Sequence, residues 1–218
     1  MTRNEMSCSA WRLYVIVDRA AVGTRDVADV AEEAIRGGAD VIQLRDKAAS
    51  TRQLHQEALR VRAVTKAAGI PLIINDHVDI AHAVGADGVH LGQDDLPIAA
   101  ARAILGPNRL IGRSTHSLEQ AIAAELDGAD YIGVGPIFPT PTKPGSQSVG
   151  VDLIRQVALR LSVPFVCIGG IDTTTLQSVL SAGAERIAVV RAVCGAANPH
   201  EAAAALKQRL ITRHHAAP

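Results

Sequence analysis

Short apolar runs alternate along the chain with longer stretches in which apolar residues recur at helical spacing. Four runs rich in Val, Ile and Leu predict β-strands at residues 13–17, 72–75, 110–112 and 165–168. The stretches between strands predict amphipathic helices at residues 26–36, 53–68, 78–84, 98–105, 118–126, 153–161, 176–182 and 200–211.

A repeated Gly-Ala-acid step precedes four further strand-like runs. The copies begin at Gly38, Gly85, Gly128 and Gly183, at intervals of 47, 43 and 55 residues. Glycine favours the left-handed conformation that ends many helices, so each copy indicates a joint between a helix and a strand. Each interval is about twice the length of one strand-plus-helix unit, which leaves room for one further strand between successive copies.

Eight strands therefore alternate with eight helices. Near-continuous apolar strands followed by helices are typical of a parallel sheet covered by helices. We expect an α/β fold with a closed (β/α)8 TIM barrel, formed by a single domain over residues 1–218 with frayed ends at 1–10 and 214–218. The alternative is an open doubly wound sheet, which the absence of a GxGxxG motif after the first strand disfavours.

Composition narrows the function classes. The chain has 22 basic and 22 acidic residues, five aromatic side chains and 48% hydrophobic residues, which argues against disorder and against nucleic-acid partners. No run reaches the roughly 18 apolar residues that span a bilayer, and the opening lacks a signal-peptide pattern. We expect a cytoplasmic protein with reduced cysteines and no membrane partner, and the sequence leaves its oligomeric state open.

Polar residues follow the predicted strands at their carboxyl ends, where barrels of this kind carry their chemistry. They are Gln43, Arg45 and Lys47; Asn75 and Asp76; His90, Gln93, Asp94 and Asp95; Arg113, Ser114, Thr115 and His116; Gly169 and Gly170; and Val190 and Arg191.

Several of these residues also have a purely structural interpretation. Arg45 and Lys47 could form a solvated edge, and Asp76 could cap the following helix. One of Asp94 and Asp95 could cap the helix that starts near Pro97. His90 is interpreted as a hydrogen-bonded core residue, and the role of His116 stays open.

The combination favours a diphosphate site. Asp76 and Asp95 follow neighbouring strands, so their carboxylates can share one Mg2+. Arg45, Lys47 and Lys143 would supply positive charge around an anionic group that the metal bridges. The prediction is a Mg2+-assisted site for a diphosphate.

A second anion site is predicted on the other side of the mouth. Gly169 and Gly170 let backbone N–H groups approach an anion, and barrels commonly bind a phosphate after the last two strands. The loop at residues 135–145 is rich in Pro and Thr, and we expect it to act as a partial lid that presents Thr140, Thr142 and Lys143. Two anion sites indicate two small phosphorylated substrates.

Together, the strings QLRDK, NDH, GVHLGQDD, GRSTHS, GADYIGVGPIFPTPTKPG, CIGGI and AVVRA resemble the thiamine phosphate synthase family from about residue 13 to residue 199. The resemblance implies a transferase that joins a hydroxymethylpyrimidine diphosphate to a thiazole phosphate with release of pyrophosphate. It also implies a dissociative reaction, in which pyrophosphate leaves before the thiazole nitrogen captures the aminopyrimidine cation.

The resemblance implies roles for individual residues. The pyrimidine diphosphate would be held by Gln43, Leu44, Arg45, Asp46, Lys47, Asn75, Ser114 and Lys143, of which Arg45, Ser114 and Lys143 would be catalytic. The thiazole phosphate would contact Thr140, Pro141, Thr142, Gly170, Val190 and Arg191. Asp76 and Asp95 would bind Mg2+. His77 and Arg191 depart from the family pattern, which commonly has arginine and serine at these positions.

Two other functions fit the same barrel. A thiazole tautomerase-like isomerase would use a histidine after the fifth strand, where His116 lies. A non-catalytic sensor of phosphorylated ligands would keep the barrel without turnover. The acidic pair Asp76 and Asp95 and the cations Lys47 and Lys143 favour the synthase over both.

Overall fold

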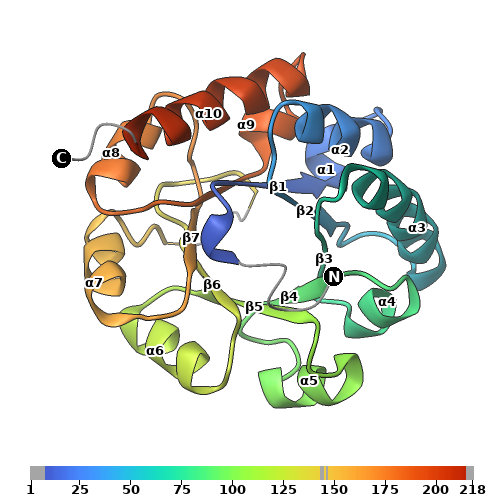
Figure 1. Ribbon diagram of the computed structural model, residues 1–218, viewed down its shortest axis with the longest axis horizontal. Helices are drawn as coiled ribbons and strands as arrows, with labels where there is room; N and C mark the ends of the chain where they lie inside the picture. Colours follow the sequence, from blue (N-terminus) through green and yellow to red (C-terminus); the bar gives the residue numbers. More distant parts are fainter. Residues whose placement is uncertain (1–7, 143–144, 146, 215–218) are drawn as a thin grey trace.

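The computed structural model describes residues 8–142, 145 and 147–214, and it contains a closed barrel of eight parallel strands paired in sequence order, with β8 returning to β1 (Figure 1). The strands are β1 Leu13–Asp18, β2 Val41–Arg45, β3 Leu72–Asn75, β4 Gly88–Leu91, β5 Leu110–Thr115, β6 Tyr131–Val134, β7 Phe165–Ile168 and β8 Ile187–Val189. The predicted (β/α)8 barrel is confirmed.

Helices follow each strand and form the outer ring in Figure 1. The helices of six or more residues are α2 Val27–Arg36, α3 Thr51–Ala68, α4 Val78–Ala83, α5 Ile98–Leu105, α6 Leu118–Leu126, α7 Asp152–Arg160, α8 Leu176–Ser181 and α10 Pro199–His214. Three short helical segments were not predicted, namely η1 Cys8–Ala10, α1 Arg19–Val22 and α9 Arg191–Cys194. Each has only three or four residues, too few for a hydrophobic period to be visible in the sequence.

Alternate residues of each strand pack in two separate apolar layers. Ile42 and Leu44 of β2 face the helices and belong to the larger cluster between sheet and helices. Tyr14, Ile73 and Tyr131 belong to a second cluster inside the barrel. The side-chain period of two in a strand therefore leaves Gln43 and Arg45, which alternate with Ile42 and Leu44, facing the barrel interior.

The acidic residue of the Gly-Ala-acid repeat ties neighbouring strands together. Asp40 accepts hydrogen bonds from the backbone N–H groups of Arg12 and Leu13, each at 2.8 Å. Asp87 accepts from Leu72 N at 2.8 Å, and Asp130 accepts from Ile111 N at 2.8 Å. The glycines of all four copies have the expected positive φ, at Gly38, Gly85, Gly128 and Gly183. In these three copies the glycine ends a helix, and the aspartate binds the first residues of the strand that precedes that helix.

A cation from an outer helix pairs with each of these three carboxylates. Lys207 of α10 pairs with Asp40, Arg62 of α3 pairs with Asp87 at 2.6 Å, and Arg102 of α5 pairs with Asp130 at 2.6 Å. The fourth copy differs, because Glu185 pairs with the adjacent Arg186 at 3.1 Å rather than with a cation of an outer helix, and Arg186 also donates to the amino-terminal segment.

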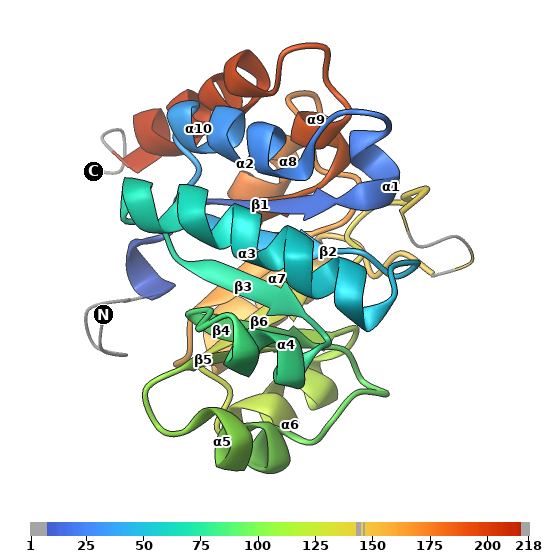
Figure 2. The same ribbon diagram turned by 90° about the vertical axis from the view of Figure 1, so that its right-hand side faces the viewer.

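That segment closes the bottom of the barrel. Cys8 and Trp11 are buried, and the Arg186 guanidinium donates to the carbonyl oxygens of Cys8 at 3.1 Å and Ser9 at 2.8 Å. The expectation of a frayed terminus through residue 10 is therefore wrong for residues 8–10. Cys8 is buried, and the guanidinium of Arg186, the residue before β8, holds η1 in place. Figure 2 shows η1 at the end of the barrel opposite to the one toward which β1 points.

The opposite end, where the strands finish, carries α1 and the loop between β6 and α7 (Figure 2). Within the described residues, no helix is long and apolar enough to cross a membrane.

Candidate active site

A cavity of about 360 Å³ opens at the carboxyl ends of the strands. A second, smaller pocket of about 190 Å³ lies beside it. Both are lined by Arg45, Asn75, Ser114 and His116, so these side chains form their common wall. The mouth therefore contains two adjoining compartments.

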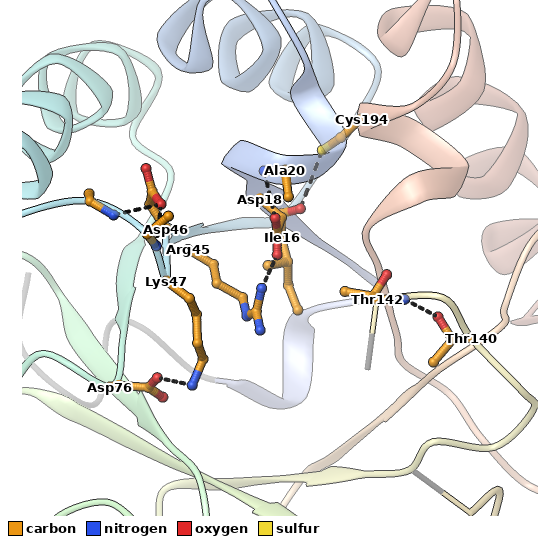
Figure 3. A network of polar contacts seen from close by, with 12 residues as sticks. Ile16, Asp18, Ala20, Arg45, Asp46, Lys47, Asp76, Thr140, Thr142 and Cys194 are labelled. Atoms are coloured by element: carbon orange, nitrogen blue, oxygen red, sulfur yellow. Dashed lines mark hydrogen bonds and ion pairs between the residues drawn. The ribbon is translucent and has the colours of Figure 1, made fainter. Parts of the chain in front are cut away.

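Two cations lie at or just after the end of β2, Arg45 in this wall and Lys47 in the smaller pocket, and each has an acidic partner (Figure 3). Arg45 pairs with Asp18 at the end of β1, and the Asp18 side chain is only 3% exposed. Lys47, which is 59% exposed, places its Nζ 2.7 Å from the Asp76 carboxylate. Asp18 also accepts from Ala20 N at 2.9 Å, so α1 and the Arg45 guanidinium are fixed by the same carboxyl group.

Asp18 was missed in the sequence because it is the last residue of an apolar strand and no motif surrounds it. The available signal was its alternation with Tyr14 and Ile16, two residues that line the main cavity.

Two of the three aspartates that line the smaller pocket, Asp76 and Asp95, are in contact, and Asp94 is the third. Asp95 lies within hydrogen-bonding reach of the Asp76 carboxyl group and accepts from Gly92 N at 2.6 Å. Burial, and then the neighbouring Asp76 carboxyl group, raise the pKa of Asp95, which Lys47 opposes. Asp76 itself adopts a left-handed φ of 62°, and its N–H donates to His90 O at 2.9 Å. Such a conformation is uncommon for a residue with a side chain, and here it accompanies a carboxylate turned toward Asp95 and Lys47.

The alternative role of these carboxylates as helix caps does not hold. α4 begins after His77 and α5 begins after Pro97, and within the described residues neither helix has a capping side chain. The oxygens of Asp76 and Asp95 therefore face the pocket and each other.

The other side of the mouth is formed by the loops after β6, β7 and β8. Six residues that the family resemblance assigned to the thiazole phosphate all line the main cavity: Thr140, Pro141, Thr142, Gly170, Val190 and Arg191. Lys143 lies outside the described residues.

The two glycines after β7 allow the loop after β6 to approach. A Cβ on Gly169 would lie 2.5 Å from Pro136 Cα, and a Cβ on Gly170 would lie 2.7 Å from Phe138 Cβ. Two backbone hydrogen bonds join the segments, from Ile137 N to Ile168 O at 2.8 Å and from Phe138 N to Gly169 O at 3.0 Å. The sequence predicts that these glycines approach an anion, which stays a prediction, and the structure shows that they let the loop after β6 pack closely against β7.

Two predicted contact residues do not face either compartment. The Leu44 side chain is fully buried in the cluster between sheet and helices. Asp46 accepts from Ala48 N at 2.9 Å and from Ala49 N at 3.0 Å, which stabilises the turn after β2. His77 is exposed, with its Nδ1 3.9 Å from Asp79, and lines neither compartment.

The floor of the cavity is more polar than the sequence suggested. Gln43 is 2% exposed, and its amide nitrogen donates to the Tyr14 hydroxyl at 2.7 Å. Tyr131 and His90 continue this chain of contacts to Ser114. His90 is thus a hydrogen-bonded interior residue, in agreement with its structural interpretation, but it contacts a residue of the cavity wall.

His116 lies where the two compartments meet the loop after β6. Its Nδ1 contacts the carbonyl oxygen of Gly135 at the start of the loop after β6. The ring lines both compartments and joins β5 to that loop.

A closed parallel barrel whose mouth gathers cations, paired carboxylates and glycine turns is typical of an enzyme that acts on phosphorylated small molecules. Comparison with known proteins narrows this class. The chain belongs to the thiamine monophosphate synthase family, whose model matches residues 13–193.

Individual relatives agree with this family. The chain is 51% identical over 198 residues to the thiamine-phosphate synthase of Chloroflexus aurantiacus, covering 90% of this chain and 91% of the relative. It is 48% identical to that of Shouchella clausii, covering 90% and 94%. Among solved structures, the thiamine phosphate pyrophosphorylase of Pyrococcus furiosus matches with a TM-score of 0.85 and 37% identity, covering 96% and 98%. The family and the transferase class predicted from the sequence are confirmed.

Proposed function

We propose that the protein condenses 4-amino-2-methyl-5-hydroxymethylpyrimidine diphosphate with thiazole phosphate and releases thiamine monophosphate and pyrophosphate. The observation that carries this proposal is the pair of adjoining compartments with different polar linings in a barrel of this family. One compartment contains the cations and paired carboxylates suited to a diphosphate. The other contains hydroxyls, glycine turns and Arg191, suited to a monophosphate.

The diphosphate is proposed to bind at the wall shared by the compartments. Arg45 supplies a positive charge there, Lys47 supplies a second from the smaller pocket, and Asn75 and Ser114 supply neutral donors. Lys47 would exchange part of its contact with Asp76 for the anion, whereas Asp18 would keep Arg45 in place. Lys143 would supply a further positive charge to the diphosphate, and this role rests on the family resemblance alone.

Asp76 and Asp95 fit a Mg2+ ion. Their carboxylates lie in contact, and burial, followed by the neighbouring Asp76 carboxyl group, raises the pKa of Asp95, so a bound divalent cation would favour its charged form. Oxygen ligands from one or two carboxylates, completed by substrate phosphates, are the usual environment of Mg2+. When bound, Mg2+ would supply charge that stabilises the departing pyrophosphate.

The thiazole phosphate is proposed to bind beneath the loop after β6. Thr140 and Thr142 offer hydroxyl groups, and their spacing is fixed by a 3.3 Å hydrogen bond from Thr142 N to Thr140 Oγ1. Gly170 and Arg191 face them from the ends of β7 and β8. This arrangement holds the nucleophilic nitrogen near the pyrimidine carbon that loses pyrophosphate.

Catalysis in this proposal requires no covalent intermediate with the protein. Negative charge grows on the leaving group as its C–O bond breaks, and Arg45 and Ser114 interact with that charge more strongly as it develops. Water is excluded by the apolar part of the main cavity, where Ile16, Val166 and Ile168 contribute to the wall. The thiazole nitrogen then forms the new C–N bond.

The rival isomerase would need His116 as its proton-transfer group. The described ring contacts the Gly135 carbonyl through Nδ1, a role that fixes the loop. The acidic pair and Lys47 would have no use in that reaction, and this favours the synthase. We also propose the cytoplasm as the compartment, as expected from the sequence.

The test is to incubate the full chain with both substrates and Mg2+ and to measure pyrophosphate and thiamine monophosphate. Equal amounts of both products support the proposal, and Asp95→Ala should abolish turnover. Asp79→Ala is the matched control, because Asp79 is 69% exposed and lines neither compartment. Isomerisation of the thiazole without pyrophosphate release would contradict the proposal.

A further inference from the structure

A chain of buried and half-buried polar groups runs beneath the cavity from β2 to β5. The Gln43 amide nitrogen donates to the Tyr14 hydroxyl at 2.7 Å, and the Tyr14 and Tyr131 hydroxyls lie 2.9 Å apart. His90 Nδ1 lies 3.1 Å from the Tyr131 hydroxyl, and His90 Nε2 lies 2.9 Å from Ser114 Oγ. Each of the five residues lies on a different strand, so the barrel brings together residues up to 117 positions apart.

The barrel makes space for this chain at β5. A Cβ on Gly112 would lie 2.2 Å from the Tyr131 ring and 2.5 Å from His90 Nδ1. A Cβ on Gly133 of β6 would lie 3.1 Å from His90 Cε1. These two positions therefore have no side chain where the histidine and tyrosine rings meet, and an alanine at Gly112 would displace both rings.

The first donor gives the chain a direction. A side-chain amide nitrogen only donates, so the Tyr14 hydroxyl accepts from Gln43 and has its own hydrogen left to donate. Its second partner within the described residues is the Tyr131 hydroxyl, which accepts that hydrogen. Tyr131 then donates to His90 Nδ1, which leaves the histidine proton on Nε2.

The last link determines what Ser114 can do. With its proton on Nε2, His90 donates to Ser114 Oγ, and the serine hydrogen is available to a ligand in the cavity. In the reverse direction, Ser114 would donate to His90, and the buried Tyr14 hydroxyl would meet two donors with no acceptor along the chain. A buried hydroxyl hydrogen without an acceptor is costly, which favours the first direction.

We propose that Tyr131 and His90 are positioning residues that hold the Ser114 hydroxyl as a hydrogen-bond donor to the substrate diphosphate. The role of the Ser114 hydroxyl rests on the proposed function, whereas the proton position on His90 does not. Burial raises the pKa of both Tyr14 and Tyr131, so both hydroxyls keep their hydrogens at neutral pH.

The first test is the tautomer of His90, measured without substrate. The full chain labelled with 15N in its histidines gives ring nitrogen signals whose shifts distinguish Nε2–H from Nδ1–H, and His90→Gln identifies the signals by their loss. We expect Nε2–H at His90. An Nδ1–H tautomer would overturn the proposal, whatever the enzyme's activity.

The second test compares two chemically identical changes. Tyr131→Phe removes the donor to His90 Nδ1, and we expect the Nδ1 signal to move to that of an acceptor nitrogen without a hydrogen bond, with the proton still on Nε2, because an Nδ1–H facing a phenylalanine ring would lack an acceptor. Tyr14→Phe leaves Tyr131 its hydrogen to donate, so the Nδ1 signal should stay that of a hydrogen-bonded acceptor. Equal effects of both variants on the Nδ1 signal would contradict the directed chain.

The third test links the chain to turnover. Tyr131→Phe should leave the Ser114 hydroxyl less well held as a donor, and the weaker hydrogen bond from Ser114 to the charged diphosphate should lower kcat/KM for the pyrimidine diphosphate about tenfold. In a Ser114→Ala background, Tyr131→Phe should have little further effect, since the hydroxyl that it positions is already absent. Fully additive losses would indicate a general packing role and would overturn the proposal. Absence of any turnover in the unmodified enzyme would refute the proposed function and leave the tautomer result standing.

Discussion

Replacing Asp87 by alanine tests the repeated Gly-Ala-Asp device that connects helices to strands. The Asp87 side chain is 7% exposed and accepts from Leu72 N at 2.8 Å and from Arg62 at 2.6 and 3.4 Å. Its loss leaves the start of β3 without its carboxylate partner and a guanidinium that is 22% exposed without its counter-charge. β3 and β4 carry Asn75 and His90, so this joint also positions the site.

The expected cost follows from burial. Breaking a buried ion pair by removal of one partner costs about 3–5 kcal/mol, and the partial exposure of Arg62 places this pair near about 3 kcal/mol. For a chain of this size, about 2–4 °C of melting temperature is lost per kcal/mol, so Asp87→Ala should lower Tm by roughly 6–12 °C. Asp87→Asn keeps an acceptor for Leu72 N and should fall between Asp87→Ala and the unmodified protein.

The assay is thermal unfolding followed by circular dichroism, with Asp152→Ala as the matched control. Asp152 is 82% exposed and pairs with Arg155 of the same helix, so its removal should change stability by about 0.5 kcal/mol or less. If Asp87→Ala lowers Tm no more than Asp152→Ala does, the carboxylate of the repeat does not hold the strands together.

Three further predictions concern the site. Asp95→Asn should raise Tm in the absence of metal, because it removes the repulsion from Asp76. At a Mg2+ concentration ten times Kd, the unmodified protein should gain about 1.4 kcal/mol of stability, or roughly 3–6 °C in Tm, and Asp95→Asn should lose this gain. Because the pKa of Asp95 is raised in the folded state, its contribution to stability falls as the pH rises from about 3.9, the ordinary value, through the folded pKa. The Tm advantage of Asp95→Asn should therefore be larger at pH 7 than at pH 4. An equal advantage at both pH values would contradict the charge explanation. Gly170→Ala should raise KM for thiazole phosphate more than for the pyrimidine diphosphate, because its Cβ would meet Phe138, whereas Gly23→Ala, with a similar φ of 69° and nothing within 4 Å, should change neither KM.

The order of strands and helices was predictable because it depends on local patterns. The apolar runs at β3 and β7 and the helical periods at α5 and α6 gave the same bounds as the structure. The Gly-Ala-acid repeat also marked the joints correctly, but the sequence did not reveal what its carboxylates do. Their partners, such as Arg62 for Asp87, lie 25 residues away on a helix face and become neighbours only after the barrel closes.

The same reason explains what the sequence missed in the site. Asp76 and Asp95 could be paired because the ends of neighbouring parallel strands must meet. Asp18 and the Tyr14–Tyr131 contact depend on which inward-facing side chains are long enough to touch across the barrel, and single apolar strands give no signal for that. The family resemblance predicts Leu44 as a contact residue, whereas strand alternation turns its side chain toward the helices.

The most direct test of the account is a crystal structure of the full chain with pyrophosphate and Mn2+, which replaces Mg2+ and is located by anomalous scattering. We expect one ion coordinated by Asp76 and Asp95 and by pyrophosphate oxygens, with Arg45, Lys47 and Ser114 within hydrogen-bonding distance of the anion. An ion bound elsewhere, or pyrophosphate bound without either aspartate on its metal, would contradict the central claim.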